Sequence, residues 1–219
     1  MGTISVNKMA GYCLIIGPIA AVLIYFIQPG GVLGIGGQPD PTDAEAVIKL
    51  WTGDLQTYGI ITSMLIPVAL ITMLSGLMYF VQSLEGGNGF ALARLGMPMV
   101  FIAVVGWTIG SGLSLGAGVG TITLIGDREL ATIGYTLAAL STFLFGVGGF
   151  LIALGASTRD DLNSIFANIA ALAAVVVVIT AQVSLLATDQ ATTMSMIGGI
   201  CYIVYTLWAI SLGRGMISK

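Results

Sequence analysis

The feature that most constrains this chain is a set of six apolar stretches whose interiors contain no charged residue. Each is long enough to cross a bilayer, which takes about 20 residues of helix. The 219-residue chain is 57% hydrophobic and 8% charged, which is too apolar for a soluble domain of this size. The sequence therefore predicts an all-α integral membrane protein with a single domain, residues 1–219. Its bundle of six transmembrane helices is expected over residues 9–28, 58–82, 96–119, 131–156, 164–187 and 194–213.

The charged residues between these stretches predict the orientation of the chain. An even number of spans places both termini on the same side of the membrane. Five of the seven basic residues fall on that side, and two fall on the other. Because Lys and Arg in short loops stay in the cytoplasm, we expect a multi-pass protein of a cell membrane with both termini cytoplasmic. The five are Lys8, Arg94, Arg159, Arg214 and Lys219; the two are Lys49 and Arg128.

The third span contains an unusual density of glycine over residues 104–120, VVGWTIGSGLSLGAGVG. On a helix its small residues form two stripes with four-residue spacing. Such stripes let a neighbouring helix approach backbone to backbone in a bilayer, where packing drives association. We therefore expect this helix at the centre of the bundle, with a close neighbour on each side. The predicted packing residues are Gly106, Gly110, Ser114 and Gly118 on one stripe and Gly112, Gly116 and Gly120 on the other.

A short amphipathic helix is predicted over residues 42–55, outside the spans. Thr42 and Glu45 have the spacing of a capping box, and Pro41 suits the start of a helix. Apolar side chains then recur at helical intervals and form one face, which predicts a helix lying on the outer surface of the membrane. That face is expected to pack on lipid, on neighbouring parts of this chain or on a partner protein. Its interfacial residues are Val47, Ile48, Trp51 and Leu55, with Trp51 as the anchor.

Two segments beyond the outer ends of spans are both apolar and rich in glycine, residues 29–39 and 116–126. They contain too much glycine for a regular helix and are too apolar for an ordinary loop. One interpretation makes them slack linkers at the membrane interface. The other has them folding together over the outer mouth of the bundle, because irregular backbone at membrane depth needs protein or a water-filled cavity around it.

The residue types exclude most chemistry. The chain has no histidine, and its spans contain no lysine and no carboxylate, so the usual metal sites, catalytic triads, Schiff bases and proton relays have no residues to form them. The net charge of −3 and the scattered basic residues argue against a nucleic-acid partner. We therefore expect a protein that is not an enzyme, with no catalytic residue, cofactor or metal.

Two functions remain open. The first is a structural or accessory subunit that packs with copies of itself or with other membrane subunits, surrounded by membrane lipids. The second is a passage or binding protein for a small neutral or apolar molecule. In that case Trp107, at mid-depth in the third span, and Gln182, one turn from the outer end of the fifth, are the expected ligand contacts.

Overall fold

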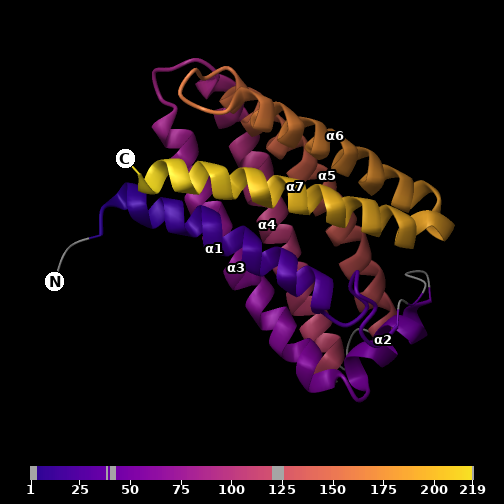
Figure 1. Ribbon diagram of the computed structural model, residues 1–219. Helices are drawn as coiled ribbons and strands as arrows, with labels where there is room; N and C mark the ends of the chain where they lie inside the picture. Colours follow the sequence, from indigo (N-terminus) through magenta and orange to yellow (C-terminus); the bar gives the residue numbers. More distant parts are fainter. Residues whose placement is uncertain (1–3, 38, 40–42, 120–125, 219) are drawn as a thin grey trace.

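The computed structural model describes residues 4–37, 39, 43–119 and 126–218, and within them it is helical with connecting turns (Figure 1). Six helices are long and apolar enough to cross a membrane, which confirms the predicted six-helix membrane bundle. They are α1 (Val6–Ile27), α3 (Gln56–Ser83), α4 (Phe90–Val119), α5 (Asp127–Ser157), α6 (Ser164–Leu186) and α7 (Ala191–Ile217). The short helix α2 (Ala44–Thr52) and a single 3-10 turn, η1 (Thr188–Gln190), complete the order.

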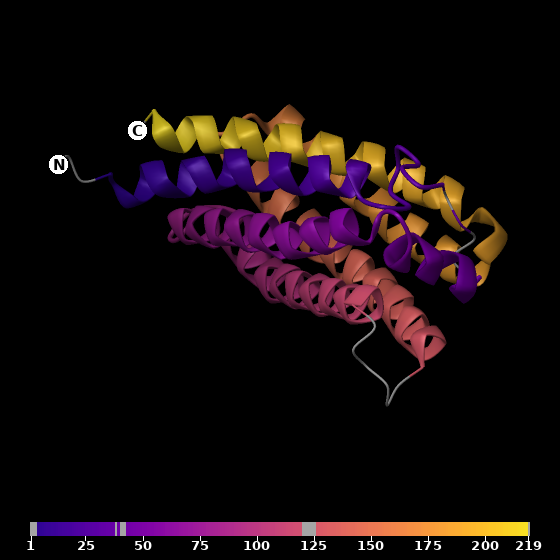
Figure 2. The same ribbon diagram turned by 90° about the horizontal axis from the view of Figure 1, so that it is seen from below.

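The six long helices form a closed ring in chain order. Each packs against the helices before and after it, and α7 returns to pack against α1. Figure 2 shows part of this order, with α7, α1, α3 and α4 following one another across the molecule. The prediction that α4 lies at the centre is therefore wrong: α4 is one member of the ring. Its outer face is open to the surroundings, with Phe101, Ile102 and Ile109 each about half exposed (49%, 55% and 52%).

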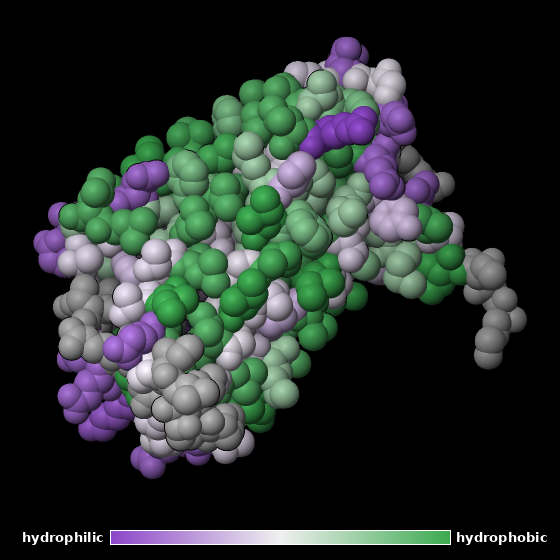
Figure 3. Space-filling model, turned by 180° about the vertical axis from the view of Figure 1, so that it is seen from behind, coloured by the Kyte–Doolittle hydropathy of each residue, from purple (hydrophilic) through white to green (hydrophobic). Residues whose placement is uncertain are grey.

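Both termini lie at the same end of the bundle, and α2 lies at the opposite end (Figure 1). We call the half of the bundle nearest the termini the proximal half and the other the distal half. Apolar side chains cover the middle of the molecule, while hydrophilic residues gather toward its ends (Figure 3). A band of this kind is what a membrane-spanning bundle presents to lipid.

Six of the seven helices begin a few residues away from the predicted start, and in two of them the difference changes how the helix is capped or where a proline lies. Helix α2 starts at Ala44, and its N-cap is Asp43, whose carboxylate accepts a hydrogen bond from the backbone N–H of Ala46 at 3.1 Å. Thr42, the predicted first residue of the capping box, and Pro41 before it lie outside the described residues. Helix α4 starts at Phe90, so Pro98 lies well inside the helix and leaves the carbonyl four residues earlier without its usual N–H donor.

Glycines bring the helices of the proximal half into backbone contact. A Cβ atom added at Gly96 of α4 would stand 2.5 Å from the carbonyl oxygen of Gly148 on α5. A Cβ at Gly11 of α1 would stand 2.7 Å from the carbonyl oxygen of Gly213 on α7. Neither position has room for a larger residue. Around these contacts the core is filled by fully buried side chains, the largest being Trp208, Leu14, Leu77, Ile152 and Val100.

The predicted packing stripes of α4 behave differently along their length. Gly106 lies directly against Ser141 of α5, as expected of a close neighbour. At Gly110 and Gly112, by contrast, no described residue places an atom within 4 Å of where a Cβ would be, so the predicted close approach is missing there. Ser114 and Gly116 are partly buried. Gly118 belongs to the helix, but its surroundings are not described, and Gly120 lies outside the described residues.

Candidate ligand-binding cavity

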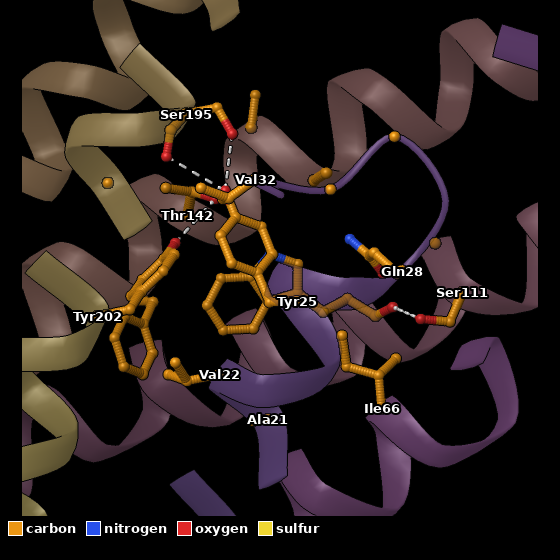
Figure 4. A pocket seen from close by; sticks show the side chains of 18 of the residues that line it. Ala21, Val22, Tyr25, Gln28, Val32, Ile66, Ser111, Thr142, Ser195 and Tyr202 are labelled. Carbon is orange, nitrogen blue, oxygen red and sulfur yellow. Dashed lines mark hydrogen bonds between the residues drawn. The ribbon is translucent and has the colours of Figure 1, made fainter. Parts of the chain in front are cut away.

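The open space beside Gly110 belongs to a cavity of about 450 Å³ in the distal half of the ring. All six long helices contribute to its wall, together with Trp51 of α2 and residues of the segment that follows α1. Side chains converge on it from both sides of the ring (Figure 4). The cavity falls within the volume range of about 300–1,000 Å³ that is typical of small-molecule sites.

Aromatic side chains form a continuous surface on one side of the cavity. The ring of Tyr202 on α7 lies 5.6 Å from that of Tyr25, 6.2 Å from that of Trp107 and 5.9 Å from that of Phe145, measured between centroids. Phe145 in turn lies 5.2 Å from Tyr205. Most of these pairs meet edge to face, an arrangement that stabilises aromatic clusters. Trp107, predicted as a possible ligand contact, is part of this surface.

Two tyrosine hydroxyls in the cavity are held by hydrogen bonds between helices. The hydroxyl of Tyr25 on α1 bonds to Oγ of Ser195 on α7 at 2.8 Å. The hydroxyl of Tyr202 donates to Oγ1 of Thr142 on α5 at 3.5 Å, the long limit for such a bond. Figure 4 shows both pairs on the same side of the cavity. They tie α7 to α1 and to α5 across the distal half.

Serine and threonine hydroxyls line the cavity on α4 and α6, and each donates to a carbonyl of its own helix. Ser111 donates to Trp107 at 2.9 Å and Ser114 to Gly110 at 3.2 Å. On α6, Thr180 donates to Val177 and Ser184 to Ala181, both at 3.0 Å. Back-bonding of this kind satisfies a hydroxyl inside a helix without a partner helix.

The cavity wall is free of charge. None of the described residues that line it is Asp, Glu, Lys or Arg. Its floor contains Tyr205, whose hydroxyl is buried and has no hydrogen-bond partner among the described residues. The ring of Tyr205 lies between Phe145 and Trp208, at centroid distances of 5.2 and 5.0 Å. Such a wall accommodates an uncharged molecule.

The segment after α1 folds over the distal mouth of the cavity. Its turns use positive φ angles at Gly30, Gly34, Gly36 and Gly37 (70°, 68°, 78° and 99°), a conformation that glycine adopts readily and other residues avoid. Gly30, Gly31 and Val32 line the cavity. The first glycine-rich segment therefore lies against the cavity, while the prediction that the two segments fold together stays untested. The second segment lies largely outside the described residues.

Helix α2 completes the cover. The ring of Trp51 lies against Gly59 at the start of α3, where an added Cβ would stand 2.8 Å from it, and Trp51 also lines the cavity. Leu50 and Leu55 lie against the glycines of the preceding segment. Of the predicted interfacial face, Trp51 and Leu55 thus pack on this chain, and Val47 and Ile48 are partly buried. Helix α2 packs beside α3, α4 and α5.

Sequence reasoning placed one ligand contact in the wall and missed several others. Gln182 is exposed on α6 and is not part of the wall. The missed residues include four tyrosines, Tyr25, Tyr135, Tyr202 and Tyr205. The spacing of Tyr202 and Tyr205, three positions apart on one helix face, together with a third tyrosine near the same depth on the first span, was the signal available.

Fold and site together define a class: a closed six-helix membrane bundle with an uncharged, aromatic cavity in one half. Comparison of this chain with protein-family models, with curated proteins and with solved structures finds no match in any of the three. The function is therefore argued from the cavity alone.

Proposed function

We propose that this protein binds a small, neutral and mainly apolar molecule in the distal cavity. The observation that carries the proposal is the charge-free cavity of about 450 Å³ that all six long helices line. Burying an ion there without a counter-charge is costly, whereas apolar surface is favoured on aromatic walls. The uncharged wall therefore favours a neutral, mainly apolar ligand.

The alternative of a structural or accessory subunit has less support. Its predicted docking surface was the apolar face of α2, and the central side chain of that face, Trp51, packs against Gly59 and the cavity. The remaining exposed apolar side chains lie along the long helices, where lipid serves as well as a protein partner. Association with copies of this chain or with other membrane subunits stays a prediction.

The proposal is tested by filling the cavity from a position that has room. Gly110 lines the cavity, and no described residue places an atom within 4 Å of its Cβ position, so the side chain of Gly110→Leu starts in open space and takes up part of the cavity. Gly112, two residues further along α4, has the same free space, is exposed and is not part of the wall. Gly112→Leu is therefore the matched control.

Native mass spectrometry of protein extracted gently from its own membrane is the measurement. The unmodified protein and Gly112→Leu should retain the same small molecule, and Gly110→Leu should lose at least nine-tenths of it. Retention of that molecule by Gly110→Leu at the level of the control would show that the distal cavity is not where it binds. Absence of any retained molecule, followed by failure to take up added apolar compounds, would overturn the proposal.

We also propose that the proximal end faces the cytoplasm, on the strength of the five basic residues predicted there. Asn88, in the turn between α3 and α4, and Asp54, beside α2, are both exposed and mark the two ends. In a background with Cys13 and Cys201 replaced by serine, a membrane-impermeant maleimide added to intact cells should label Asp54→Cys and leave Asn88→Cys unlabelled. The reverse pattern would invert the orientation.

A further inference from the structure

Two buried hydroxyls in the cavity wall have no hydrogen-bond partner among the described residues. Five serines and threonines of the described part of the chain are buried, and three of them, Thr62, Ser141 and Thr180, donate to carbonyls of their own helices. The other two are Ser63 on α3 and Thr206 on α7, which are 4% and 8% exposed and whose hydroxyls bond to no described residue. Both residues line the cavity. We refer to Ser63 and Thr206 as the donor pair.

The local structure of α3 explains why the hydroxyl of Ser63 does not bond to its own helix through the usual carbonyl. A serine inside a helix commonly donates to the carbonyl three or four residues earlier. The carbonyl four residues before Ser63 belongs to Gly59, and it already accepts the hydroxyl of Thr62 at 3.0 Å in addition to its backbone bond within the helix. Because a carbonyl oxygen has two lone pairs, this acceptor is filled, which favours a partner for Ser63 outside the helix.

Other polar side chains of the wall differ from the donor pair in burial or in bonding. Gln28 and Thr192 are only partly buried, so water reaches them. Thr142 already accepts a hydrogen bond from the hydroxyl of Tyr202. The hydroxyl of Tyr205 has no partner among the described residues, but it has almost no accessible surface. The donor pair is therefore where a ligand gains most from a hydrogen bond, because a buried donor without a partner carries a free-energy cost that such a bond removes.

We infer that the donor pair binds an oxygen atom of the ligand, so that the ligand is a mainly apolar molecule with an acceptor oxygen of the kind found in ketones, esters, ethers and alcohols. The hydroxyls of Ser63 and Thr206 donate to this oxygen, while the hydrocarbon part packs on Phe145 of α5. The donor pair lies on the two neighbours of α1, and the ring order places α5 across from α1. This inference rests on the proposed function and narrows its ligand class, because a pure hydrocarbon would leave both hydroxyls unsatisfied.

The test compares two probes of nearly the same shape, 2-acetylnaphthalene and 2-isopropenylnaphthalene. The second has a C=CH₂ group in place of the C=O group of the first, so that only the ketone accepts a hydrogen bond and neither probe donates one. Binding to the purified full-length protein in detergent is measured by equilibrium dialysis and corrected for the uptake of each probe by protein-free micelles. We expect the ketone to bind about tenfold more tightly than the hydrocarbon, the factor that corresponds to one hydrogen bond of ordinary net strength.

A double variant and its matched control locate the bond. Ser63→Ala/Thr206→Val removes both hydroxyls of the donor pair with little change of shape, and it should bring the preference for the ketone down to about twofold or less while binding of the hydrocarbon stays unchanged. Thr62→Val/Ser141→Ala is the control, because it makes the same two kinds of substitution at buried residues that are not part of the cavity wall. The control should keep the full preference.

The outcomes separate this inference from the proposed function. Equal binding of both probes to the unmodified protein would mean that water satisfies the donor pair, and it would overturn the inference while leaving a neutral-ligand site in place. A preference for the ketone that survives Ser63→Ala/Thr206→Val, or that the control loses to the same extent, would overturn the assignment to these two residues. Binding of neither probe by the folded protein counts against both the inference and the proposed function.

Discussion

The two halves of this bundle use glycine for opposite purposes. In the proximal half, Gly96 meets Gly148 and Gly11 meets Gly213, so that the backbones of neighbouring helices touch. In the distal half, Gly110 and Gly134 on adjoining helices have no atom of the described residues within 4 Å of their Cβ positions, and both line the cavity. The same residue type closes one half of the ring and leaves space in the other.

The difference shows that a glycine in a membrane helix permits close approach but does not cause it. Helices α4 and α5 are in contact at Gly96 and again where Gly106 meets Ser141, whereas one turn later, at Gly110, no described residue reaches within 4 Å of the Cβ position. Beyond that point the ring contains Tyr25, Trp107 and Tyr202, which pack on one another between helices. Large side chains on the inner faces keep the distal helices apart, and the small ones between them become cavity wall.

The largest effect should come from adding a methyl group to each kind of glycine on the same helix. Gly96→Ala pushes a Cβ against the carbonyl oxygen of Gly148 and should destabilise the fold by about 1–3 kcal/mol, the usual cost of overpacking. Gly110→Ala meets no neighbour and should stabilise α4 by about 0.5–1 kcal/mol, since alanine loses less backbone entropy than glycine. Unfolding in mixed micelles of increasing SDS content measures both.

Equal losses of stability in these two variants would break the comparison, because they would mean that the distal helices are as tightly packed as the proximal ones. A loss of stability confined to Gly96→Ala would support the difference in packing between the two halves. Gly215→Ala serves as a control at the proximal end, since that glycine is exposed and has no atom within 4 Å of its Cβ position.

A smaller effect, with opposite signs, is expected from removing two tyrosine hydroxyls. Tyr205 lies at the floor of the cavity with a buried hydroxyl that has no partner among the described residues, so Tyr205→Phe should raise the free energy of unfolding by about 1 kcal/mol. The hydroxyl of Tyr58 donates to the carbonyl of Ile27 at 2.7 Å and holds α3 to the end of α1. Tyr58→Phe should lower the free energy of unfolding by about 1 kcal/mol.

The same SDS titration checks this pair. Tyr79→Phe is the control, because Tyr79 is 46% exposed on the outer surface of α3, and it should change little. A destabilised Tyr205→Phe would show that its hydroxyl has a partner that stabilises the floor of the cavity.

The sequence was sufficient to predict the six spans, because the absence of charge over about 20 residues leaves few alternatives. The sequence could not predict that the helices form a ring. The small-residue stripes of α4 indicate where another helix can approach, but not which helix approaches there. The cavity was out of reach for the same reason: its volume depends on the inner faces of six helices at once. The segment around Gly30 and Gly36 was the exception, as apolar residues with dense glycine pointed to a folded cover as one of two options.

The short helix α2 illustrates the limit more closely. The spacing of its apolar residues predicted an apolar face, and in the structure the residues of that face, Val47, Ile48 and Trp51, are partly buried. The local sequence does not indicate what that face packs against, because lipid, a partner protein and the glycines of this chain can all pack against the same apolar surface. Gly59, which receives the ring of Trp51, lies in the following helix and carries no sequence signal for this contact.

The smallest effect is expected from removing helix N-caps, one at the start of α2 in the cover and one at the start of α6 in the ring. Asp43 accepts a hydrogen bond from Ala46 at the start of α2, and Asn163 accepts one from Phe166 at the start of α6, at 3.1 and 3.0 Å. Loss of such a cap costs about 0.5–2 kcal/mol of helix stability. Because α2 lies outside the ring, Asp43→Ala should speed hydrogen exchange within α2 and leave global unfolding unchanged, whereas Asn163→Ala should lower global stability by about 0.5 kcal/mol or slightly more.

Asp43→Asn keeps an acceptor oxygen at the cap and should exchange as slowly as the unmodified protein. A fall in global stability for Asp43→Ala as large as that for Asn163→Ala would mean that the cover and the ring unfold as one unit, and that the distal half is as cooperative as the proximal half.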